Sequence, residues 1–241
     1  MRAVAASARG HALLLHGAGG GGWEWARWRP LLEAQGLAVA APDLMPAAGG
    51  LEATALDDYL AQARAALSAL PGPRLLVGAS LGGLLAAAIA DAADALVLVN
   101  PLPPAPWAWE LPAREWPARV PWRQQARLDS TRRAIPEADP ATALFAFRRW
   151  RDESGQVLAQ AHAGIELAPP CRPLLCIASG ADEDVPPALT RALATAWRGD
   201  LFELAGASHV GPLLGRDAAV VAGRVLDWWR ACRPQAATAR L

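Results

Sequence analysis

One serine lies in a local pattern that suits a nucleophile. Ser80 is the centre of the run Gly78-Ala79-Ser80-Leu81-Gly82. The apolar residues 75–77 before it predict a strand, and the Ala-rich residues 81–90 after it predict a helix. A sharp strand-to-helix turn forces the serine toward positive φ and leaves room only for small side chains two positions before and after it. The two glycines meet that requirement, so we expect Ser80 to act as a nucleophile.

A serine hydroxyl is a weak nucleophile at neutral pH and needs a base, for which histidine has a suitable pKa. The chain has four histidines, and His209 follows the last predicted strand, at 201–204, in a loop that contains glycine. Catalytic groups gather in loops at the carboxyl ends of parallel strands. His209 is therefore the predicted base, and the alternative is a structural loop histidine.

The base in turn requires a carboxylate that orients the imidazole and stabilises its charged form. After a nucleophile in a strand-to-helix turn, the chain order is serine, then acid, then histidine. The predicted strand at 174–178 leads to three acids, Asp182, Glu183 and Asp184. We predict Asp182 as the acid and keep Asp184 as the alternative, with the unused carboxylates in a solvated turn.

Acyl transfer to serine also needs backbone N–H donors for the developing oxyanion. The first is expected from Leu81, where the dipole of the following helix helps. The second is expected from the Gly-rich run at 16–22, with Ala18 as the best donor and Gly19 close behind. Such a loop could also cradle a dinucleotide phosphate, but the next strand does not end on an acid in the usual setting. We therefore expect no nucleotide cofactor.

The elements that must position these groups alternate between strand and helix. Strands are predicted at 12–15, 38–41, 75–77, 95–99, 174–178 and 201–204, and helices at 25–35, 51–70, 81–90, 187–197 and 218–232. This order predicts an α/β fold with a mostly parallel, doubly wound sheet covered on both faces. We expect one domain over residues 1–241.

One stretch interrupts the alternation. Residues 101–168 contain no strand-like run and are rich in Pro, Arg and Trp, so we predict an inserted helical cap there. Its five tryptophans are Trp107, Trp109, Trp116, Trp122 and Trp150. Indole rings can line an apolar or aromatic acyl pocket, although they also pack small helical inserts onto a sheet. We predict that Trp107 and Trp122 bind substrate, together with Trp23 and Gly19 beside the oxyanion loop.

Composition excludes several classes of partner and chemistry. The 23 basic residues balance 23 acidic ones, so no net field favours nucleic acid or an anionic membrane. All the basic residues are arginines, and a chain without lysine cannot form a lysine Schiff base. The predicted partner is a small-molecule substrate, and the sequence leaves the oligomeric state open.

The cysteines and the apolar runs indicate the compartment. Cys171, Cys176 and Cys232 are odd in number and have no CxxC spacing, which argues against a disulfide framework and a structural zinc site. We find no signal-like segment and no run of 18 apolar residues. We expect a cytoplasmic protein with no metal and no cofactor.

From about Leu13 to Trp229 the chain resembles the α/β-hydrolase superfamily. The motifs that carry the resemblance are His-Gly-x at 16–18, Gly-x-Ser-x-Gly at 78–82, Asp-x-x-Val-Pro at 182–186, and His209. The resemblance implies the α/β-hydrolase fold, favours Asp182 over Asp184, and implies that His16 orients the oxyanion loop. The segment around Trp23 further resembles the methylesterase and hydroxynitrile lyase branch. Plant lyases of that branch place a lysine after the catalytic histidine, whereas this chain has Val210, which does not fit cyanohydrin cleavage.

The expected activity is hydrolysis of a carboxylic ester or related acyl bond of a small apolar or aromatic molecule through an acyl-Ser80 intermediate. The same three residues could also cleave a thioester, a lactone or a carbon–carbon bond of a β-diketone. A ligand-binding module with little turnover is the remaining alternative. The sequence does not separate these possibilities.

Overall fold

A computed structural model describes residues 9–232 of the 241-residue chain, so both ends of the predicted domain, 1–8 and 233–241, lie outside the described residues. Six parallel strands form the central sheet in the order β2-β1-β3-β4-β7-β8. Their bounds are β1 Gly10–Leu15, β2 Leu37–Ala40, β3 Arg74–Ala79, β4 Ala95–Val99, β7 Leu174–Ser179 and β8 Asp200–Leu204. The predicted parallel α/β sheet is confirmed.

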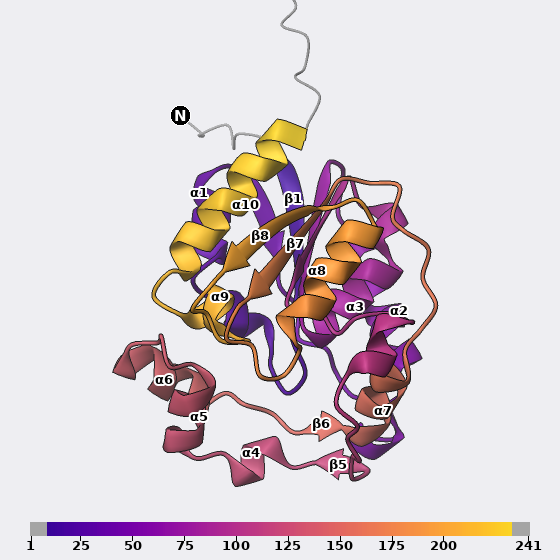
Figure 1. Cartoon of the computed structure of the whole chain (residues 1–241), viewed down its shortest axis with the longest axis vertical. Helices are drawn as coiled ribbons and strands as arrows, with labels where there is room; N and C mark the ends of the chain where they lie inside the picture. The colour runs from indigo at the N-terminus through magenta and orange to yellow at the C-terminus, as the bar shows by residue number, and fades with distance from the viewer. Residues whose placement is uncertain (1–8, 233–241) are drawn as a thin grey trace, which may run out of the picture.

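Helices cover both faces of the sheet (Figure 1). One face packs against α2 (Leu56–Ser68), α3 (Leu81–Ala88) and α8 (Pro187–Ala196), and the other against α1 (Arg29–Ala34) and α10 (Ala218–Cys232). The inner strands are buried on both sides, which explains why β4 reads as a continuous apolar run and not as an alternating one. Two short elements, η3 (Ala90–Ala92) and α9 (Gly211–Leu214), complete the sheet region.

Two predicted helices are shorter than expected. The one at 25–35 divides into a 3₁₀ turn, η1 (Gly22–Trp25), and α1, which begins where Pro30 occupies its first turn. The one at 51–70 divides into η2 (Leu51–Ala53) and α2. Thr54 interrupts it in an extended conformation, and the Asp58 carboxylate accepts the Ala55 N–H (2.8 Å), which caps α2.

The insertion between β4 and β7 lies beyond the carboxyl ends of the strands (Figure 1). It contains η4 (Trp107–Glu110), α4 (Trp122–Gln125), α5 (Leu128–Ala134), α6 (Pro140–Phe147) and α7 (Gly155–Ala163). The expectation that it lacks strands is wrong, because β5 (Arg119–Val120) pairs antiparallel with β6 (Glu153–Ser154). Two-residue strands are too short to show any periodicity in a sequence.

No helix within residues 9–232 has the length and apolarity needed to cross a membrane.

Candidate active site

Ser80 lies in a strained turn between β3 and α3. Its backbone has φ 52° and ψ −120°, a conformation that residues other than glycine rarely adopt. A Cβ at Gly78 would lie 2.1 Å from the Gly82 carbonyl oxygen, and a Cβ at Gly82 would lie 2.4 Å from the His16 carbonyl oxygen. Both glycines are therefore required by close backbone approach, and the turn holds the serine side chain at the carboxyl end of β3.

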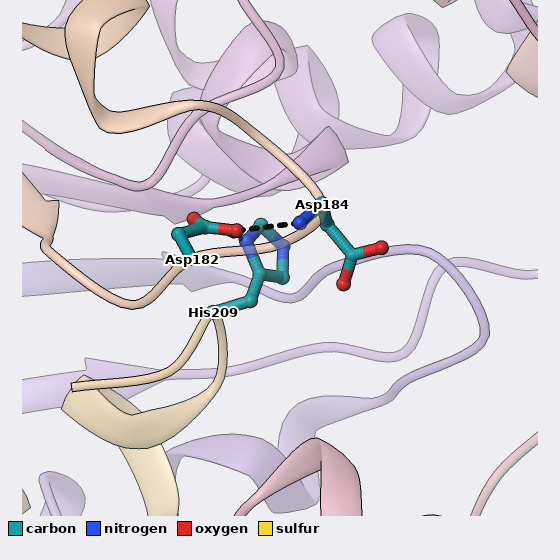
Figure 2. A group of neighbouring side chains, drawn as sticks. All are labelled: Asp182, Asp184 and His209. Atoms are coloured by element: carbon teal, nitrogen blue, oxygen red, sulfur yellow. Dashed lines mark hydrogen bonds and ion pairs between the residues drawn. The ribbon is translucent and has the colours of Figure 1, made fainter. Parts of the chain in front are cut away.

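His209 and Asp182 form a hydrogen-bonded pair at the same edge of the sheet. His209 Nδ1 lies 2.7 Å from Asp182 Oδ2, and the carboxylate is almost fully buried (Figure 2). The other oxygen of Asp182 accepts the N–H groups of Asp184 and Val185, both at 2.9 Å. These bonds hold the carboxylate in one orientation, and the carboxylate in turn orients the imidazole.

Asp184, the alternative acid, does not contact the imidazole through its carboxylate. Its side chain points away from the pair (Figure 2), is more than half exposed, and forms an ion pair with Arg114 at 3.6 Å. The carboxylates of Asp182 and Asp184 and a nitrogen of His209 lie within 4.8 Å of one another, a spacing that suits a metal ion. Asp182 Oδ2 is already paired with His209 Nδ1, which is the geometry of an acid–base pair.

The electrostatics of His209 favour its charged form. Burial lowers its pKa, but the hydrogen bond that Nδ1–H donates to Asp182, the charge of that carboxylate and the charges of Asp184 and Glu24 outweigh burial, so the pKa is raised above its ordinary value. An imidazole with this bias accepts a proton readily and holds it while a second group reacts.

The loop after β1 places Ala18 at the cavity that contains Ser80. The N–H groups of Gly17, Gly19 and Gly20 are bound by the Glu24 carboxylate, the Glu153 carboxylate and the Gly17 carbonyl. Ala18, with Leu81 at the start of α3, stays the predicted pair of donors for an oxyanion.

The same loop does not suit a nucleotide phosphate. Three of its N–H groups, those of Gly17, Gly19 and Gly22, already donate to carboxylates of the protein. A phosphate would have to approach these negative charges and replace them. The hydrogen bonds thus agree with the expectation that the loop serves a different purpose.

His16 fixes the loop's conformation. Its Nε2 accepts the Leu44 N–H at 2.9 Å, so the ring proton lies on Nδ1 and is donated to the Gly17 carbonyl oxygen at 2.7 Å. Burial lowers the pKa of His16 to about 4, and the ring stays neutral. It makes the structural contacts that the sequence suggested.

A cavity of about 480 Å³ opens between the sheet edge and the insertion. Ser80, His209 and Ala18 line its floor, and side chains of the insertion line its walls. The aromatic wall residues are Trp116, Trp122, Trp150 and His162. The volume suits a small organic molecule, and the indole rings make the walls largely apolar.

The family assignment follows from residues 12–223, which match the model of the alpha/beta hydrolase family. The chain belongs to this family. Norfluorocurarine synthase 1 from Strychnos nux-vomica is 38% identical over 91 residues, covering 34% of this chain and 34% of that protein. Salicylic acid-binding protein 2 from Nicotiana tabacum is 40% identical over 80 residues, covering 31% of each. The chain thus spans about a third of the length of the curated relatives that it matches.

A solved structure extends the similarity over nearly the whole fold. The methylesterase MES16 from Arabidopsis superposes with a TM-score of 0.69 and 16% identity, covering 91% of this chain and 99% of that one. At this identity the match supports the fold alone. The resemblance to the α/β-hydrolase superfamily is therefore confirmed, and a methylesterase is among the proteins with the same fold.

Three predicted substrate-binding residues of this hydrolase do not line the cavity, whereas Trp122 does. Trp23 packs edge-on against Phe145 and Trp150, with ring centroids 5.9 and 5.1 Å apart. Trp107 packs edge-on against Trp197 of the α8 region at 6.2 Å. Gly19 lies against the Trp122 ring, because a Cβ at this glycine would be 2.5 Å from Trp122 Cε3. Trp23, Trp107 and Gly19 thus lie in the packing between the insertion and the sheet, and their contacts with substrate stay predictions.

Sequence reasoning missed a buried asparagine that holds the histidine loop of this α/β hydrolase. Asn100 follows β4 and has a positive φ of 43°. Its side-chain N–H groups donate to Ser179 Oγ and to the His209 carbonyl oxygen, both at 2.8 Å, and its Oδ1 accepts the Ser179 N–H at 2.8 Å. The only sequence signal is an asparagine directly after a buried strand.

Two carboxylates of the insertion also reach the active-site loops. Glu153 accepts the Gly19 N–H (2.9 Å) and the Tyr59 hydroxyl (2.8 Å), so it braces the oxyanion loop. Glu137 accepts the Ser208 N–H and, at 2.9 Å, the Ser208 hydroxyl, directly before His209. The insertion therefore supports both arms of the site as well as covering it.

Proposed function

We propose that this α/β hydrolase is a serine esterase. In this proposal it cleaves a carboxylic ester or related acyl bond of a small apolar or aromatic substrate through an acyl-Ser80 intermediate. The observation that carries the proposal is the convergence of three elements on one cavity: the strained Ser80 turn, the His209–Asp182 pair, and Ala18 of the loop after β1. No cofactor is needed for this chemistry.

The proposed reaction begins with attack of Ser80 Oγ on the acyl carbon, while His209 accepts the hydroxyl proton. The negative charge on the acyl oxygen is bound by the N–H groups of Ala18 and Leu81. Collapse of this intermediate breaks the bond to the leaving group, which takes the proton from His209. Asp182 stays ionised throughout and stabilises the imidazolium.

The walls of the cavity support an apolar or aromatic acyl group. Trp116, Trp122 and Trp150 surround the space above Ser80, and the volume of about 480 Å³ matches a small ligand. An esterase reading also agrees with the methylesterase among the structural neighbours. A small-molecule substrate is the only partner that the proposal requires.

A fluorophosphonate probe tests the proposal. We expect one covalent adduct on Ser80 in the folded protein and none in Ser80→Ala. A panel of p-nitrophenyl esters of increasing acyl length and aromaticity, with acyl-CoA thioesters and lactones alongside, then defines the bond that is cleaved. Absence of the Ser80 adduct would refute the proposal and would favour a ligand-binding module on the same fold.

A further inference from the structure

A second, smaller cavity adjoins Ser80. It has a volume of about 50 Å³ and is lined by Ser80, His209 and Ala18, together with Glu24 from the η1 turn. The remaining walls come from Gly17, Ala79, Trp150, Val210 and Leu213. A site of about 10–15 Å³ is enough to hold a water molecule, provided that polar groups face it. This cavity meets both conditions and touches the reacting serine.

Glu24 is unusual in its setting. The residue is only 3% exposed, and one of its oxygens accepts the Gly17 N–H at 3.0 Å. Within residues 9–232 its carboxylate forms no ion pair, although Arg151, Asp43 and His209 lie near enough to affect its charge. Burying a carboxylate without an ion pair is costly, and a leucine at this position would avoid that penalty.

We propose that the small cavity is the site of the hydrolytic water and that Glu24 binds this water for attack on the acyl-Ser80 intermediate. The inference rests on the proposed esterase function and adds to it the residue that serves the second half of the reaction. It is carried by position: the groups that surround an acyl carbon on Ser80, namely Ala18 and His209, share this cavity with one buried carboxylate.

The step balances as follows. One water O–H is hydrogen-bonded to Glu24 and the other points to His209, so a lone pair of the oxygen faces the acyl carbon. As the new C–O bond forms, His209 accepts the second proton. The bond from the acyl carbon to Ser80 Oγ then breaks, and His209 returns that proton to the serine. The products are the free carboxylic acid and the restored enzyme.

Burial also sets the ionisation of Glu24. It raises the pKa of this carboxyl to about 7, while the Gly17 N–H and the charges of His209 and Arg151 lower it and Asp43 raises it. The ionised form accepts the water O–H, and the neutral form does not offer the same charge to the water. The group thus changes state close to neutral pH.

The competing interpretation is that Glu24 only holds the oxyanion loop through Gly17. The two interpretations differ in the step they affect. A loop brace supports acylation and deacylation equally, because Ala18 binds the oxyanion in both. A water-binding group affects deacylation alone.

The test separates the two half-reactions in Glu24→Gln, with Glu52→Gln, an exposed η2 residue, as the matched control. Rapid mixing with a p-nitrophenyl ester gives acylation as a burst and deacylation as the steady rate, and intact mass spectrometry detects the acyl-enzyme. We expect the burst and the rate of fluorophosphonate labelling to stay within about threefold of wild type. We expect steady turnover to fall by about 100-fold, which is the lower end of the range for a positioned acid–base group, with acyl-enzyme accumulating.

Glu24→Asp is a second variant, which keeps the carboxylate charge but withdraws it from the cavity. It serves as the test if Glu24→Gln does not fold. Because the shorter side chain also withdraws from the Gly17 N–H, the burst should fall somewhat, and steady turnover should fall more than the burst. Equal loss of burst and turnover, or no loss of either, would overturn the water site. Failure of wild type itself to label at Ser80 would instead refute the esterase proposal, and the water site would fall with it.

Discussion

Glu137 provides the strongest test of whether the insertion supports catalysis. This residue lies between α5 and α6, and its carboxylate accepts both the N–H and the hydroxyl of Ser208, the residue before His209. Its own carbonyl oxygen accepts the Arg216 N–H. Glu137→Ala would remove both side-chain bonds and leave the N–H of Ser208, which is only 8% exposed, without an acceptor.

The expected size of the effect follows from the number and type of these bonds. A hydrogen bond to a charged group contributes about 1.5–3 kcal/mol, and the only partly buried position of Glu137 favours the lower value. Two such bonds predict a loss of about 3 kcal/mol in the free energy of unfolding. The loop also loses a restraint beside His209, so we expect kcat/KM for an ester to fall by about tenfold or more, because misplacement of a catalytic group by about 1 Å is that costly.

The assay combines urea unfolding with ester kinetics. Glu115→Ala, at an exposed position of the same insertion, is the control and should change neither quantity. Glu137→Gln retains one oxygen acceptor and should recover part of the loss. If Glu137→Ala keeps wild-type kcat/KM in the folded protein, the insertion does not position His209 and the reasoning is refuted.

Three further predictions test other parts of the site. Asp182→Asn should lower kcat/KM by about 10³-fold or more, whereas Asp184→Asn should have little effect. Asp182 raises the pKa of His209, and the neutral imidazole is the active base, so kcat/KM should fall as pH drops through that pKa. In Asp182→Asn the acidic limb of the pH profile of kcat/KM should therefore move to lower pH. An unmoved acidic limb would contradict this. Gly78→Ala would bring a Cβ within 2.1 Å of a carbonyl oxygen and should lower the free energy of unfolding by about 3 kcal/mol or prevent folding, which thermal unfolding would measure. Trp122→Ala should shift the ester preference toward bulkier acyl groups by about tenfold, and an unchanged profile would show that this ring does not limit the acyl group.

The sequence predicted the position of those side chains whose placement follows from a few neighbouring residues. Ser80, Asp182 and His209 each follow a parallel strand, and such strands all end at the same edge of the sheet, so three separate segments had to converge there. The paired glycines around Ser80 are likewise required by a turn that five residues define. Information of this kind lies within a few positions of the residue concerned.

Residues that act across long separations gave no comparable signal. Glu153 reaches Gly19 over 134 positions and Glu137 reaches Ser208 over 71, and neither contact leaves a pattern in the nearby sequence. The tryptophans show the same limit, because a Trp-rich composition does not tell which of the rings face the cavity. Trp122 and Trp107 belong to the same Trp-rich insertion, yet one faces the cavity and the other packs near α8. Composition predicts that an insertion carries indole rings, but only the path of its backbone decides which ring faces substrate.

Three carboxylates from separate segments connect local sequence with long-range contacts at the Gly-rich loop. Glu24, Glu153 and Asp43 accept the N–H groups of Gly17, Gly19 and Gly22 in the Gly-rich loop, whereas Ala18 faces the cavity that contains Ser80. A loop of glycines alone would offer several N–H groups to an anion with little preference among them. Carboxylates from the η1 turn, the insertion and the segment after β2 bind three of these N–H groups and restrain the loop. In the proposed esterase, these carboxylates and not the abundance of glycine decide which N–H groups of the loop remain for an oxyanion.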